Sequence, residues 1–88
     1  MAHSKQAKKR VRQNEVRRQR NKTTASSMRT EFKKLMTTVE GGDKGAAEQQ
    51  LTATLSRIDK AAKRHVIHRN AAARKKSQAM RAVGQMAG

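Results

Sequence analysis

Residues 28–58 read MRTEFKKLMTTVEGGDKGAAEQQLTATLSRI, and they hold two apolar stripes on either side of a glycine pair. The first stripe has the three- and four-residue spacing of one helix face, and it comprises Met28, Phe32, Leu35, Met36 and Val39. Gly41 and Gly42 predict the end of this helix, because glycine adopts positive φ readily. Asp43 comes next and offers a carboxylate to cap the following helix. The stretch therefore predicts a helical hairpin.

The second stripe repeats the same spacing, and it comprises Leu51, Leu55, Ile58 and Ala62. We expect it to face the first stripe. The chain has no proline, and no glycine lies between Gly45 and Gly84. A single helix over residues 44–83 would be about 60 Å long, and its second half would have nothing to pack on. A bend within residues 65–70 is therefore predicted.

The predicted bend contains residues that weaken or cap a helix. Val66 and Ile67 are β-branched and lower helix propensity, and either His68 or Asn70 is able to serve as a cap. A weaker third stripe follows, and it comprises Ala72, Ala79, Val83 and Met86. The expected fold class is all-α, a three-helix bundle with a long, projecting basic N-terminal helix. The expected single domain, 1–88, is divided into a basic arm that begins helix one (1–22), the rest of helix one (23–40), helix two (43–64) and helix three (68–86).

The first predicted helix is longer than its partners. From residue 5 to residue 40 it would reach about 54 Å, whereas roughly 20 residues of the second helix would cover only about 30 Å of it. Its N-terminal half must therefore project. Residues 1–22 hold nine Lys or Arg against one acid, Glu15. Because a helix that is polar on all sides is not stable alone, we expect this arm to be mobile when free and to become ordered on binding a partner.

The net charge of +16 is concentrated at the two ends of the chain. Residues 1–22 and 57–88 each carry +8, and residues 23–56 are neutral. Such dense like charge indicates a polyanionic partner, most economically a nucleic acid. Phe32 is the only aromatic residue, and its place in the first stripe assigns it to the core. Because no aromatic remains for base stacking, we expect contacts with phosphates, ribose hydroxyls and RNA shape.

Other function classes fit the sequence poorly. We expect no enzymatic activity, because the acids are scattered and there is neither a cysteine nor a Gly-rich phosphate loop. His65 and His68 have a metal-compatible spacing but no third ligand nearby, so we expect no metal and no cofactor. No segment approaches the roughly 20 apolar residues of a membrane span, and no membrane association is expected. The alternative left open is a basic helical DNA-binding or nucleoid architectural protein, although a helix charged on all sides better suits the crevices of folded RNA.

Four segments resemble a known family. They are AHSKQAKKR from Ala2, MRTEFKK from Met28, EGGDKGAAEQQL from Glu40 and IHRNAAARKKS from Ile67. The last fits the family pattern I-H-x-N-x-A-A-R-x-K-S without a gap, and together the segments resemble bacterial small-subunit ribosomal protein number twenty. Many relatives have Gly where this chain has His65 and Lys where it has Ala71.

The resemblance implies a structural role in the small ribosomal subunit. A member of this family is a cytoplasmic, ribosome-bound three-helix bundle, present as a monomer within the subunit, that binds 16S ribosomal RNA directly and stabilises its fold during assembly. The implied RNA partners are the 5′ domain and the long stem of the 3′ minor domain.

The resemblance also places two groups of residues in the RNA interface. The basic N-terminal helix of the family corresponds to Lys5, Lys8, Lys9, Arg10, Arg12, Arg17 and Arg18. The C-terminal motif corresponds to His68, Asn70, Arg74, Lys75, Lys76 and Ser77. Neighbouring basic and amide side chains complete the predicted RNA-binding set: Asn14, Arg20, Asn21, Lys22 and Arg69. Hydroxyl groups that follow the arm, those of Thr23, Thr24, Ser26 and Ser27, are expected to supply further neutral donors and acceptors.

Overall fold

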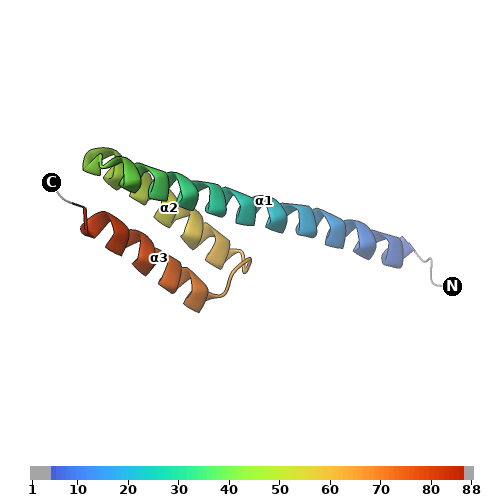
Figure 1. Ribbon diagram of the computed structural model, residues 1–88. Coiled ribbons are helices and arrows are strands. Elements are labelled where there is room, and N and C mark those ends of the chain that lie inside the picture. Colours follow the sequence, from blue (N-terminus) through green and yellow to red (C-terminus); the bar gives the residue numbers. More distant parts are fainter. Residues whose placement is uncertain (1–4, 87–88) are drawn as a thin grey trace.

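The computed structural model describes residues 5–86, which form three helices: α1 (Lys5–Gly41), α2 (Lys44–Lys63) and α3 (Arg69–Gly84) (Figure 1). No strand occurs within residues 5–86. Helices α1 and α2 form an antiparallel hairpin, and α3 folds back along α2 (Figure 1). This arrangement confirms the predicted all-α fold with a long first helix.

The connection between α1 and α2 uses the glycine pair and the acid that follows it. Gly42 has a φ of +80°, and its backbone N–H donates to the Val39 carbonyl at 3.1 Å. Asp43 is the N-cap of α2, and its carboxylate accepts from the Ala46 N–H at 3.1 Å. The chain therefore reverses direction in two residues, with the first donors of α2 partly satisfied.

The connection between α2 and α3 is a Schellman motif closed by a residue other than glycine. The Val66 N–H donates to the Ala61 carbonyl at 2.9 Å, and the His65 N–H donates to the Ala62 carbonyl at 3.0 Å. These two bonds require a left-handed residue between them, and His65 supplies it with a φ of +58°. His68 then caps α3, because its Nδ1 accepts from the Asn70 N–H at 3.1 Å. The bend thus lies where the sequence predicts it.

The core consists of two apolar clusters along the bundle. One cluster comprises Met28, Ile58, Ala61 and Ala72. The other comprises Leu35, Ala47, Ala79 and Val83. Phe32 packs against both clusters but is only half-buried, and the Lys75 ammonium stands 5.6 Å from its ring centroid. Phe32 therefore packs on the core as predicted, although its ring lies at the margin of the core and is not fully buried.

The buried face of α2 differs from the single stripe that we predicted. Ala47, Thr54, Ile58 and Ala61 are buried, whereas Leu51 and Leu55 are only partly buried, as is Ala62. The physical reason is that α2 packs against both α1 and α3. Three of the four buried side chains of α2 are small, and the two leucines pack against the second cluster while staying partly buried.

A buried polar network joins α2 to α1 inside this core. The hydroxyl of Thr54 is fully buried and lies 2.9 Å from the Gln50 carbonyl and 3.1 Å from the Glu31 carbonyl. The Gln50 amide Nε2 donates to the Glu31 carboxylate at 2.6 Å and to the Glu31 carbonyl at 3.2 Å. No buried side-chain donor or acceptor of the described residues lacks a partner. These bonds fix the register between the two helices, which apolar stripes alone specify weakly.

The molecule is strongly elongated. Its principal extents are 65 × 21 × 15 Å and its radius of gyration is 17.6 Å, against about 12 Å for a compact domain of this length. The excess comes from α1, whose N-terminal half extends beyond the other two helices (Figure 1). Within residues 5–86, no helix is both long and apolar enough to span a bilayer.

Candidate nucleic-acid interface

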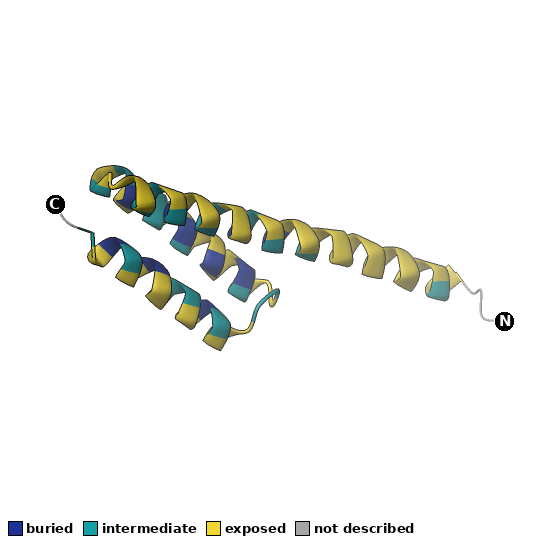
Figure 2. Ribbon diagram, viewed as in Figure 1, coloured by how far each residue is buried: buried dark blue, intermediate teal, exposed yellow. Residues whose placement is uncertain are grey.

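The projecting half of α1 is an exposed helix with almost no apolar surface to bury. Every residue from 5 to 20 except Ala7 is exposed, in contrast to the half of α1 that lies over the bundle, where Thr24, Met28 and Leu35 are buried; in Figure 2 the outer half of α1 is almost entirely yellow. Its exposed apolar side chains include Val11 and Val16, which are 69% and 57% accessible. We call residues 5–22 the arm. Among the described residues, the other two helices leave positions 8–20 exposed, so any ordering there beyond the intrinsic helix propensity must come from a partner.

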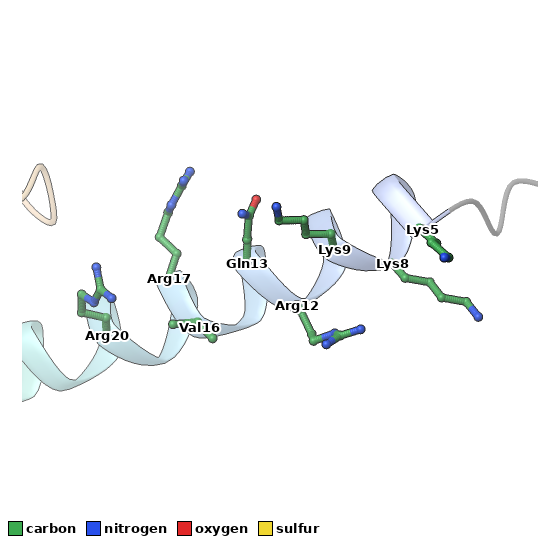
Figure 3. Close-up of a pocket in the computed structure, with 8 residues that line it drawn as sticks. All are labelled: Lys5, Lys8, Lys9, Arg12, Gln13, Val16, Arg17 and Arg20. Atoms are coloured by element: carbon green, nitrogen blue, oxygen red, sulfur yellow. The ribbon is translucent and has the colours of Figure 1, made fainter.

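Basic side chains project from both sides of the arm. One broad side lines a shallow groove, where Lys9, Gln13 and Arg17 point one way and Lys8 and Arg12 the other (Figure 3). The same groove is completed by Lys5, Val16 and Arg20. By helical spacing, the opposite side carries the remaining predicted residues Arg10, Asn14, Arg18 and Lys22. The arm therefore offers cations to ligands on more than one side at once.

The arm has one acid, Glu15, and among the described residues it forms no ion pair. Among residues 5–86, the ion pairs are Lys34 with Glu31 at 3.8 Å and Lys76 with Asp59 at 2.9 Å, and neither involves the arm. Unrelieved repulsion between neighbouring cations favours any state in which an anion lies between them. A phosphate backbone supplies such anions at regular spacing.

The second group of predicted residues gathers around the start of α3. The helix N-terminus adds the positive end of its dipole. The exposed members of the group are His68, Arg69, Asn70, Arg74 and Ser77, whereas Lys75 and Lys76 are half-buried. Three members of the group also have structural roles. The His68 imidazole caps α3, the Lys75 ammonium lies over the Phe32 ring, and the Lys76 ammonium pairs with Asp59. Within this group, Arg69, Arg74 and the polar residues beside them are thus the side chains most available to a ligand.

One hydroxyl expected in the interface is committed elsewhere. Thr24 is buried, and its hydroxyl donates to the Arg20 carbonyl at 3.0 Å while accepting from Arg64 Nη1 at 3.1 Å. It therefore cannot reach a ligand, which corrects the expectation for Thr24. The cause is its place on the face of α1 that continues the core stripe back from Met28. Asn21, one turn further toward the N-terminus, is half-buried.

Sequence reasoning missed Arg64. It lies at the end of α2 and its guanidinium reaches back to α1. The available signal was its position beside the predicted bend, which faces the base of the arm. Among residues 5–86, no group of three His, Cys, Asp or Glu side chains is arranged to hold a metal ion.

The sequence is similar to that of known proteins over most of its length. A family model described as ribosomal protein S20 matches residues 2–84. A "small ribosomal subunit protein bS20" from Corynebacterium urealyticum is 53% identical over 89% of this chain and 90% of its own length. Proteins with the same description from Colwellia psychrerythraea and Crocosphaera subtropica are 49% and 44% identical, over 89% and 99% of this chain and 91% and 97% of their own lengths.

Proposed function

We propose that this chain, which belongs to the ribosomal protein S20 family, is a structural constituent of the small ribosomal subunit that binds 16S ribosomal RNA directly. The observation that carries this proposal is the arm, an exposed helix with cations on both sides and, within residues 5–86, no ion pair of its own. The role is one of binding and RNA folding, without catalysis, on ribosomes in the cytoplasm.

Binding follows from the chemistry of phosphates. Folded RNA brings backbone segments close together, and their mutual repulsion limits how tightly the RNA can compact. A helix with Lys and Arg on several sides fits between such segments and neutralises more than one of them. Arginine guanidiniums pair with phosphates in a bidentate manner, whereas lysines act as point charges. Because the arm exposes no aromatic side chain, it is expected to recognise RNA shape and spacing rather than base identity.

The molecule offers two basic surfaces with different directions. The outer part of the arm extends along the 65 Å long axis away from the bundle, whereas Arg69 and Arg74 lie on α3, which begins at the end of the bundle from which the arm projects (Figure 1). We propose that these two surfaces bind separate elements of 16S ribosomal RNA, the 5′ domain and the long stem of the 3′ minor domain. The protein would then hold the two RNA elements in a fixed relation during assembly.

The arm can be tested by charge removal with a matched control. Changing Lys8, Lys9, Arg10 and Arg12 to Gln should weaken binding to a 16S ribosomal RNA transcript and flatten the log–log salt dependence by roughly 0.7–0.9 for each phosphate that the variant no longer neutralises. The control removes the same charge from the neutral middle of the chain, by changing Arg29, Lys33, Lys34 and Lys44 to Gln. An equal effect in both variants would mean that net charge, not the arm, drives binding. Duplex DNA competing as well as the RNA at moderate salt would favour the DNA-binding alternative.

A further inference from the structure

We propose that the junction where the arm leaves the bundle is a binding site for one backbone phosphate of RNA, with Arg64 as its central ligand. This proposal rests on the proposed RNA-binding function and adds a site outside the arm and the α3 motif. The observations that carry it are a hollow lined from two directions, an arginine held in place by a buried hydroxyl, and a lining that, among the described residues, includes no carboxylate.

The hollow lies between two parts of the chain that are far apart in sequence. Arg17, Arg20 and Asn21 line it from α1, and Arg64 and His65 line it from the connection between α2 and α3. This connection stands beside α1 at the point where the bundle ends (Figure 1). Arg17 and Arg20 are at the end of the arm nearest the bundle (Figure 3). The fold therefore gathers three arginines and an asparagine around one hollow.

The helical register of α1 explains why these residues face the connection. The stripe that is apolar at Leu35 and Met28 continues through Thr24, Asn21 and Arg17 at steps of three and four residues. The bundle covers this stripe as far as Thr24, which is buried, and leaves Arg17 exposed. The same face of α1 thus packs on the other helices in one half and is polar and basic in the other half. This change is expected where the face leaves the bundle and meets RNA instead.

Arg64 is oriented before any ligand arrives. Its Nη1 donates to the Thr24 hydroxyl, and that hydroxyl donates in turn to the Arg20 carbonyl. Thr24 is buried, so its position is fixed by packing. This one bond leaves four of the five guanidinium donors without a further bond to residues 5–86. A preoriented planar fork loses little side-chain entropy on binding a phosphate, which is the condition for a specific contact.

The positive charge around the hollow is not paired with a carboxylate among the described residues. No carboxylate of residues 5–86 forms an ion pair with Arg17, Arg20 or Arg64. Three guanidiniums around one hollow repel one another unless an anion lies between them. A purely structural arginine would be expected to end on a carboxylate or on carbonyl groups at the helix C-terminus. Instead, the contact of Arg64 is a neutral hydroxyl, which positions the charge without neutralising it.

Phosphate-ethylation interference on a 16S ribosomal RNA transcript tests the site directly. With the unmodified protein, ethylation of certain phosphates should block binding. Arg64→Met should abolish the block at one of these phosphates, reduce affinity roughly tenfold or more and flatten the salt dependence by about 0.7–0.9. The matched control is Arg81→Met, which removes an exposed arginine from the last turn of α3 and should change neither the interference pattern nor the affinity appreciably.

A conservative variant separates the phosphate contact from folding. Arg64→Lys keeps the charge and most of the stem but loses the fork, so the block at the same phosphate should weaken while thermal unfolding stays near that of the unmodified protein. If Arg64→Met unfolds, this variant decides the question. Unchanged interference with both variants would overturn the site.

Two further results distinguish a failure of the phosphate site from a failure of the RNA-binding function. If the arm variant loses binding while the Arg64 variants keep the full interference pattern, the phosphate site is wrong and the RNA-binding function stands. If the arm variant, too, binds as the unmodified protein does, the proposed function fails with it. Calorimetric titration with inorganic phosphate gives the last arm of the test: saturable binding that disappears in Arg64→Met, together with an unchanged interference pattern, would reassign the hollow to a free phosphate ion.

Discussion

The left-handed residue between α2 and α3 gives a prediction with a definite sign. His65 holds a φ of +58° in a position where a Schellman motif normally has glycine. A left-handed conformation costs an L-residue about 1–2 kcal/mol, and glycine avoids that cost. Glycine in turn loses about 0.5–1 kcal/mol more conformational entropy on folding. The difference predicts that His65→Gly raises the free energy of unfolding by roughly 0.5–1 kcal/mol.

The structure indicates that little else changes with this substitution. The two backbone bonds of the motif, from His65 and Val66, do not involve the imidazole, and the residue is exposed. For a domain of 60–100 residues, the gain corresponds to about 2–8 °C in Tm. Thermal unfolding followed by circular dichroism at 222 nm would measure it.

His65→Ala is the matched control, because it removes the same imidazole but keeps a side chain in the left-handed region. It should be no more stable than the unmodified protein, and His65→Gly should be more stable than both. A glycine variant that unfolds at the same temperature as the alanine variant would refute the argument, since backbone strain would then contribute nothing.

Three further outcomes are expected. Leu35→Ala should lower the free energy of unfolding by about 3–5 kcal/mol in urea denaturation, because Leu35 is fully buried; a loss below about 1 kcal/mol would contradict the packing. Thr54→Val should lower the same free energy by about 1–2 kcal/mol, since it removes the buried hydroxyl that lies within hydrogen-bonding distance of the Gln50 and Glu31 carbonyls, and unchanged stability would show that this hydroxyl is dispensable. In hydrogen exchange, amides of the arm should be poorly protected in the free protein and gain protection on binding 16S ribosomal RNA, whereas those of α2 should change little; protection of the arm without RNA would rule out coupled folding.

The sequence was most informative where local chemistry determines structure. Gly42 and Asp43 sit next to each other, and both act as their residue types indicate, one at positive φ and one as a cap. Apolar spacing likewise located the helix faces around Leu35 and Val83. These features depend on neighbours within a few residues.

The features that escaped prediction depend on contacts between distant segments. Thr54 is polar and was not expected in the core, because its burial requires the Glu31 carbonyl of another helix. Arg64 reaches Thr24 across forty positions of sequence, which helix periodicity cannot show. Whether the predicted RNA-binding residues contact RNA stays a prediction, although the structure exposes most of them and commits Lys75 and Lys76 partly to contacts within the protein.

Because α1 projects beyond the bundle, a stability assay detects substitutions in one part of the chain and not in the other. The two apolar clusters begin at Met28, and the residues from 5 to 20 contribute no member to either. A substitution at Arg12 would therefore leave the melting curve unchanged even if it abolished RNA binding. A substitution at Ile58 would lower the melting temperature even though it removes no charge from the arm. Screens that rank variants by melting temperature or soluble yield do not detect a loss of RNA binding by the arm. The two halves of α1 therefore need two different assays.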